Sequence, residues 1–270
     1  MCYGSKQMTT QALGENLPRL VEIMQRLLAP DGCAWDREQT LQSLRAYVLE
    51  EAFEVADAID RHDATLLCEE LGDLLLQVVF QSELARAQGW FALNEVIEGI
   101  SNKLIRRHPH VFGDVKASNS QEALKSWENI KAQENVKKGR GRLDGVPTNM
   151  PALLRAVRLA EKAAHAGYDW PGVGEVRHKV DEELAELDQA LLQNDKQAIE
   201  AELGDVLFAL ASLAYKAGVD PESALRETLG RFTKRFEKVE GLAQQQQLDL
   251  ASATDEQRDL WWQQAKRDSA

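Results

Sequence analysis

The chain has 270 residues, of which 44% are hydrophobic and 28% are charged, and its formal net charge at pH 7 is −12. These proportions are ordinary for a soluble protein with one large or two small domains, and the negative charge argues against nucleic acid as a partner, although a local basic pocket would still accept a nucleotide. The three cysteines are scattered and predict no disulfide framework. No apolar run reaches the length of about 18 residues that is needed to span a membrane, and the first residues show no signal pattern. We therefore expect a cytoplasmic protein.

The first half of the chain is predicted to form a helical domain over residues 16–137. Its residue patterns predict helices over 17–28, 40–60, 64–88, 94–107 and 121–137. The helix at 64–88 is apolar on more than one face, which predicts burial on several sides, within a bundle or at a subunit interface. The loop at 33–39 carries Trp35, which is either a core residue or a base-stacking residue.

A segment rich in Gly, Lys and Arg at 138–150 is predicted to be a linker, and a second helical domain follows over 151–270. Helices are predicted over 153–166, 222–240 and 255–266. Two further helices are predicted to flank a polar turn at residue 194. Few segments favour β-strand. We therefore predict an all-α fold with helical bundles in duplicate.

Acidic residues flank the polar turn at residue 194. Glu183 and Glu186 are three positions apart, so they share one face of the first helix, and Glu202 and Asp205 share a face of the second. Because residue 194 is the midpoint of both cross-helix pairs, an antiparallel hairpin would bring all four carboxylates to one height, roughly 12–17 Å from the turn. Their mutual repulsion calls for a cation, and oxygen ligands suit Mg²⁺, with Mn²⁺ as an alternative.

The same acidic pattern occurs once before in the chain. Each acid of the later hairpin has an acidic equivalent 132 positions earlier in the chain. These equivalents are Glu51, Glu54, Glu70 and Asp73. His62 lies at the midpoint of this earlier hairpin. The repeat predicts a second metal site, and the alternative interpretation is a pair of duplicated hairpins with solvated acidic faces.

Basic and aromatic residues that could contact a nucleotide follow the second hairpin. Arg231, Lys234 and Arg235 could hold phosphates, and Trp262 could stack on a base, which is worth roughly 1–3 kcal/mol in such contacts. The alternatives are a solvated helix face for the cations and core packing for the tryptophan.

The two acidic hairpins differ at one position beside the acids. Lys179 precedes Glu183 by one helical turn, whereas the equivalent residue of the first hairpin is Tyr47. Glu182 is a candidate for a general base, a further metal ligand or a supporting residue, and its spacing does not separate these roles. The lysine predicts that the C-terminal hairpin carries the activity and that the N-terminal one is a scaffold or a weaker site.

The repeated pattern E-E-x-x-E followed by E-x-x-D resembles the MazG family of nucleoside triphosphate pyrophosphohydrolases, in its two-domain bacterial form. Four further motifs share this likeness: 32–36 (Gly-Cys-Ala-Trp-Asp), 106–112 (Arg-Arg-His-Pro-His-Val-Phe), 127–131 (Trp-Glu-Asn-Ile-Lys) and 167–170 (Gly-Tyr-Asp-Trp). The resemblance implies tandem MazG-like helical domains, a homodimer, Mg²⁺ dependence, and hydrolysis of NTP to NMP and pyrophosphate.

By motif, the resemblance also implies roles for single residues. The metal ligands would be Glu183, Glu186, Glu202 and Asp205, and the nucleotide contacts would be Lys179, Arg231, Arg235 and Trp262. The segment 197–199 departs from the pattern, because it lacks a cation that the family often has ahead of its third acid.

These observations lead to the hypothesis of an Mg²⁺-dependent NTP pyrophosphohydrolase in which metal-activated water attacks the α-phosphorus. Di-iron chemistry is not expected, because it requires the Glu-x-x-His pattern on two paired helices, and the hairpins have this pattern on one helix only, at 175–178. The alternatives are a hydrolase of the same fold restricted to dUTP or phosphoribosyl-ATP, and a non-catalytic dimer that senses nucleotides.

Overall fold

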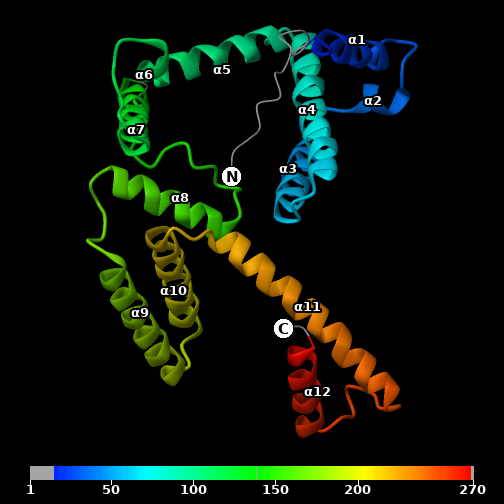
Figure 1. Cartoon of the computed structure of the whole chain (residues 1–270), viewed down its shortest axis with the longest axis vertical. Helices are drawn as coiled ribbons and strands as arrows, with labels where there is room; N and C mark the ends of the chain where they lie inside the picture. The colour runs from blue at the N-terminus through cyan, green and yellow to red at the C-terminus, as the bar shows by residue number, and fades with distance from the viewer. Residues whose placement is uncertain (1–14, 138, 269–270) are drawn as a thin grey trace. The chain divides into compact units, whose positions relative to one another are not determined.

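The computed structural model describes residues 15–137 and 139–268 and is helical over these ranges, with no strand among them (Figure 1). The helices are α1 (Leu17–Leu28), α2 (Ala34–Glu38), α3 (Arg45–Asp60), α4 (Ala64–Ala87), α5 (Leu93–Arg107), α6 (Pro109–Phe112), α7 (Ser120–Lys137), α8 (Ala152–His165), α9 (Val173–Gln193), α10 (Lys196–Ala217), α11 (Pro221–Gln245) and α12 (Asp255–Arg267). The predicted all-α class is confirmed. Among the described helices, none is long and apolar enough to cross a membrane.

The contacts divide the chain into two compact units, residues 1–127 and 128–270. The division falls within α7, so the predicted linker at 138–150 falls within the second unit by this criterion. Residues 1–14, 138, 269 and 270 lie outside the described ranges. The domain boundaries predicted from the sequence stay a prediction.

The first unit is built around the antiparallel pair α3 and α4. Met24 of α1 packs against Val79 and Phe80 of α4, and Leu44 and Leu93 complete this buried cluster. Full burial of one such side chain contributes roughly 1.5–3 kcal/mol. The cluster therefore anchors the hairpin to α1 and α5.

The second unit contains the pair α9 and α10, with α8 packed against α10, and the pair α11 and α12. Val239 and Ala243 of α11 contact Trp261 and Ala265 of α12 in a second buried cluster, which Ala253 completes. The helices α11 and α12 therefore have a core of their own.

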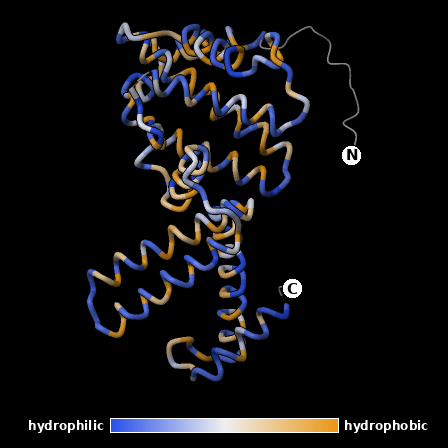
Figure 2. The backbone as a smooth tube through the Cα atoms, turned by 90° about the vertical axis from the view of Figure 1, so that its left-hand side faces the viewer, coloured by the Kyte–Doolittle hydropathy of each residue, from blue (hydrophilic) through white to orange (hydrophobic). Residues whose placement is uncertain are grey.

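The apolar faces of α4 and α10 are only partly covered within one chain. Leu71, Leu75 and Val78 of α4 and Leu203, Leu207, Phe208 and Leu210 of α10 keep 41–49% of their surface exposed. Hydrophobic and hydrophilic residues alternate along the helical coils in Figure 2. The burial on several sides that we predicted for α4 is therefore not reached by contacts within the described residues of one chain.

Candidate metal and substrate site

The two acidic hairpins share one turn geometry. His62 and Asn194, the predicted midpoints, both adopt the left-handed backbone conformation, with φ of 55° and 53°. Asp63 then caps α4 by accepting hydrogen bonds from two backbone N–H groups at 2.9 and 3.1 Å. Asp195 caps α10 in the same way, at 3.0 and 3.2 Å. Capping satisfies donors that the first helical turn leaves unpaired, so each hairpin has a fixed start for its second helix.

This turn brings three acids of the second hairpin together. Glu183 of α9 and Glu202 and Asp205 of α10 each offer one carboxylate oxygen, and these oxygens lie within 4.8 Å of one another. Glu183 is buried, with 7% of its surface exposed, whereas Asp205 is exposed. An uncompensated buried carboxylate is costly, so this arrangement calls for positive charge.

Glu186, the fourth predicted ligand, lies outside this cluster of three. It is exposed, and partial desolvation together with the Glu183 and Glu202 carboxylates raises its pKa above the ordinary value. The repulsion shows that Glu186 is electrostatically close to the cluster. Its role as a metal ligand stays a prediction.

Lys179 supplies positive charge directly beside the acids. Its Nζ lies 2.7 Å from Oε1 of Glu182 and 2.7 Å from Oε1 of Glu183. The hydrogen bonds to Glu182 and Glu183 raise the pKa of Lys179 well above its usual range. One lysine thus links the exposed Glu182 to the buried Glu183.

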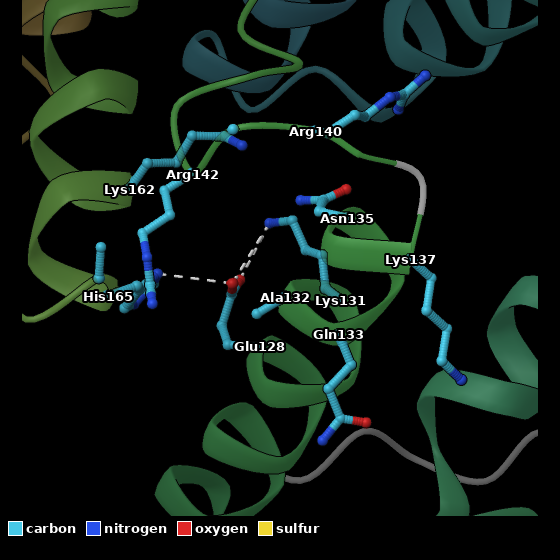
Figure 3. A pocket seen from close by; sticks show the side chains of 12 residues that line it. Glu128, Lys131, Ala132, Gln133, Asn135, Lys137, Arg140, Arg142, Lys162 and His165 are labelled. Atoms are coloured by element: carbon cyan, nitrogen blue, oxygen red, sulfur yellow. Dashed lines mark hydrogen bonds and ion pairs between the residues drawn. The ribbon is translucent and has the colours of Figure 1, made fainter.

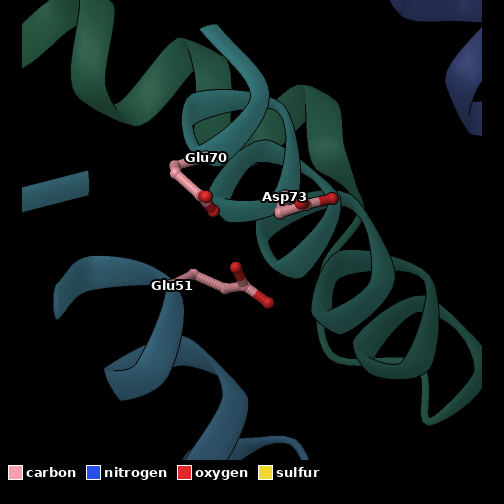
Figure 4. Close-up of side chains that lie close together, drawn as sticks. All are labelled: Glu51, Glu70 and Asp73. Carbon is pink, nitrogen blue, oxygen red and sulfur yellow. The ribbon is translucent and has the colours of Figure 1, made fainter. Parts of the chain in front are cut away.

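The first hairpin has an equivalent acidic cluster. Glu51 of α3 faces Glu70 and Asp73 of α4, and their oxygens also lie within 4.8 Å of one another (Figure 4). Desolvation first, then the Asp73 and Glu54 carboxylates, raise the pKa of Glu51. Glu54, like Glu186, lies outside the cluster of three.

The residue beside this first cluster is Tyr47 rather than a lysine. Its ring meets that of Trp35 edge-on, with 6.2 Å between the ring centroids. Trp35 keeps 53% of its surface exposed, so the interpretation of Trp35 as a core residue is wrong. The first cluster therefore has an aromatic pair where the second has a cation.

The other predicted substrate contacts lie on α11 and α12. Arg231 donates to Oγ1 of Thr228 at 2.8 Å, and Lys234 is exposed. Arg235 is half-buried, with no hydrogen-bond partner for its Nε. Trp262 packs on Phe232, with centroids 5.5 Å apart. In the described part of the chain, none of the hydrogen bonds, ion pairs or ring contacts of these four residues reaches the acids of α9 and α10.

One contact in this unit was missed by sequence reasoning. Lys216, in the last turn of α10, lies 2.6 Å from Oδ2 of Asp169 and so ties the loop that precedes α9 to the end of α10. The two residues are 47 positions apart, and no local pattern relates them.

The donor set of each cluster fits a hard divalent cation. All three donors are carboxylate oxygens, which Mg²⁺ and Mn²⁺ accept, and they come from two helices that the capped turn holds in register. Desolvation first, and then the neighbouring carboxylates, raise the pKa values of Glu51 and Glu186, and a bound cation would offset the repulsion between these carboxylates.

Comparisons with known proteins agree with two helical domains in tandem. A family model described as the MazG nucleotide pyrophosphohydrolase domain matches residues 39–112, and one described as phosphoribosyl-ATP pyrophosphohydrolase matches residues 155–231. The chain is 44% identical over 247 residues to the nucleoside triphosphate pyrophosphohydrolase/pyrophosphatase MazG of Thermotoga maritima, across 92% of this chain and 94% of that protein. It is 43% identical over 257 residues to the nucleoside triphosphate pyrophosphohydrolase of Escherichia coli, across 93% and 97%.

The fold and the site define an all-α protein with two acid-bearing helical hairpins in tandem. Each hairpin lies within the segment that one of the two family models matches. The chain belongs to the MazG family.

Proposed function

We propose that this protein is a nucleoside triphosphate pyrophosphohydrolase that converts NTP and water to NMP and pyrophosphate. The observation that carries the proposal is the convergence of Glu183, Glu202 and Asp205 in a chain of this family. A triphosphate is an anion, so an acidic cluster can bind it only through a cation. The cofactor that we propose is Mg²⁺, which Mn²⁺ could replace.

The proposed metal ligands are Glu183, Glu202 and Asp205, with Glu186 as a fourth. A divalent ion held there would neutralise phosphate charge and activate water for attack on the α-phosphorus. Lys179 orients Glu182 and Glu183 through its two ion pairs. Because Lys179 holds Oε1 of Glu182, we assign Oε2 of Glu182 as the acceptor of a proton from the attacking water.

The proposed nucleotide contacts are Arg231, Lys234, Arg235 and Trp262. Because these side chains make no hydrogen bond, ion pair or ring contact with the acids within the described chain, we propose that a second copy supplies them. The half-exposed apolar faces of α4 and α10 support such a homodimer, since a monomer rarely leaves large apolar faces in water. Light scattering coupled to gel filtration would test it, and a stable monomer at catalytic concentration would contradict it.

We place the activity in the second hairpin and treat the first as a scaffold or a weaker site. The supporting observation is that Lys179 pairs with acids of the second cluster, whereas its equivalent, Tyr47, packs against Trp35. A cation beside the carboxylates would also contact substrate phosphate.

Product analysis tests the reaction itself. The full chain is incubated with each NTP and Mg²⁺, and the products are separated. We expect NMP and pyrophosphate in equal amounts. Formation of NDP and phosphate would contradict cleavage between the α- and β-phosphates.

A second candidate substrate is phosphoribosyl-ATP. The specific observation in its favour is that residues 155–231, which contain the second acidic cluster, match the phosphoribosyl-ATP pyrophosphohydrolase model. Both substrates present the same phosphate chain to the same acids, so the difference lies in recognition of the base. Comparing kcat/KM for phosphoribosyl-ATP with the values for the common NTPs decides between them.

A further inference from the structure

A basic pocket lies in the second unit, and none of its lining residues belongs to an acidic cluster. Its walls are the C-terminal half of α7, the segment after it and the end of α8 (Figure 3). The cavity has a volume of about 400 Å³, which is within the range of small-molecule sites, roughly 300–1,000 Å³. The lining includes five Lys and Arg residues against one carboxylate, that of Glu128: Lys131, Lys137, Arg140, Arg142 and Lys162. Such a concentration stands out in a chain with a net charge of −12.

The one lining carboxylate is already compensated. Oε1 of Glu128 accepts a hydrogen bond from Lys131 at 3.1 Å, and Oε2 of Glu128 lies 3.5 Å from Nδ1 of His165. Lys162 donates to the backbone carbonyl of Asp144 at 2.7 Å, and this neutral acceptor leaves the lysine charge uncancelled. The Asp144 carboxylate, just behind the lining, accepts from the backbone N–H of Gly141 at 2.7 Å. The pocket therefore keeps a positive excess.

The side chains differ in direction. Figure 3 shows Lys131 and His165 on two sides of the Glu128 carboxylate, and Lys137 pointing outward. Ala132 and Ala166 are also in the lining, and the aliphatic stems of the lysines and arginines add apolar surface to theirs. Cations around an apolar wall suit a ligand that has a charged end.

From this geometry we infer that the pocket binds a diphosphate group without a metal ion, either as free pyrophosphate or as the terminal phosphates of a nucleotide. A terminal phosphate carries about −1.5 to −2 at neutral pH, and the phosphate bonded to it adds further negative charge, so a diphosphate suits a lining in which cations outnumber carboxylates. Arg142 offers a planar fork for phosphate oxygens, and Lys131 and Lys162 act as point charges. A space of this size does not admit a nucleic-acid duplex.

This inference goes beyond the proposed function, because it assigns a second phosphate site that needs no carboxylate. If the proposed function holds, the ligand of this pocket is a product or a substrate of the same enzyme, and the site is regulatory. The acidic clusters bind phosphates only through a metal, whereas this pocket does not, so chelation separates the two.

Calorimetry in EDTA tests the inference on the full chain, with pyrophosphate and ATP as separate probes. We expect saturable binding of one probe molecule per chain. Equal affinities identify the diphosphate group as sufficient, and tighter binding of ATP shows that the apolar wall holds the nucleoside. If neither probe binds saturably, the inference is overturned, whatever the turnover in Mg²⁺.

Matched variants locate the binding. The double variant Arg142→Gln/Lys162→Gln removes two charges, retains an amide donor for the Asp144 carbonyl, and should weaken binding at least about tenfold. Arg158→Gln on α8 removes one charge outside the pocket, and Glu183→Gln alters the acidic cluster, so both should bind as the wild type does. Wild-type affinity in the double variant, or an equal loss in Arg158→Gln, would overturn the assignment to this pocket.

Discussion

The two hairpins, α3–α4 and α9–α10, have the same turn and the same triad of carboxylates but different neighbours. Each turn has a left-handed residue followed by an aspartate cap, and each brings three acidic oxygens within 4.8 Å of one another. Beside one triad stands Lys179, paired with Glu183, and beside the other stands Tyr47, packed on Trp35. The geometry of the acids therefore depends on the turn, and the charge of the site depends on one further side chain.

Burial follows the same difference. Glu183 is buried and has a cation within 2.7 Å, whereas Glu51 is half-buried and the groups that act on its pKa are other carboxylates. A carboxylate can be taken out of water when an opposite charge accompanies it. The lysine thus explains why the second hairpin can hold its acid deeper.

Metal removal tests what the hairpins have in common and should have the largest effect. Both triads need a cation to bind a triphosphate, and a catalytic metal contributes several kcal/mol to the transition state. EDTA should therefore lower pyrophosphate release by about a thousandfold or more, and added Mg²⁺ should restore it. Turnover that persists in EDTA would contradict the metal role of both clusters.

Replacement of Lys179 tests what the hairpins do not share. Lys179→Met removes two ion pairs and leaves Glu183 buried without its cation, so kcat/KM should fall about ten- to hundredfold. The matched change in the first hairpin, Tyr47→Phe, keeps the ring contact with Trp35 and should leave kcat/KM unchanged. Equal losses in the two variants would remove the distinction between the hairpins.

The aspartate caps should matter equally in both hairpins. Asp63→Ala and Asp195→Ala each remove two hydrogen bonds to backbone N–H groups, which typically costs about 0.5–2 kcal/mol of stability. Urea denaturation of the two variants measures this cost. A clear loss in one variant only would show that the turns are not equivalent.

The left-handed turn residues should give the smallest effect. Both His62 and Asn194 have positive φ, and asparagine tolerates this conformation better than histidine does. His62→Gly should therefore stabilise its hairpin by up to about 1 kcal/mol, and Asn194→Gly by less. Thermal unfolding of the two variants provides the comparison, and destabilisation by His62→Gly would contradict it.

Much of the hairpin could be predicted from the sequence because its determinants are local. The predicted midpoints His62 and Asn194 both adopt the left-handed conformation, and three of the four acids around each midpoint converge. Helical spacing places a residue on a face but does not fix its distance across a helix pair, which is why Glu186 shares a face with Glu183 and still lies outside the triad.

Features that depend on long-range packing were not predictable in this way. The short helices α2 and α6 fall in segments without a helical period, and α11 continues to Gln245, beyond the predicted end at residue 240. The pairing of Lys216 with Asp169 has no local signal. The basic pocket joins residues of α7, the expected linker and α8, which become neighbours only when the chain has folded.

The most direct test compares Glu183→Gln with Glu51→Gln, which make the same change in the two triads. Mutation of a residue that only supports a metal ligand typically lowers metal affinity or activity about 10- to 100-fold. Mutation of a proposed ligand should cost at least as much, so Glu183→Gln should lower the rate of pyrophosphate release by about a hundredfold or more. Glu51→Gln should retain the wild-type rate. The opposite pattern, with turnover lost in Glu51→Gln and kept in Glu183→Gln, would contradict the assignment of the chemistry to α9 and α10.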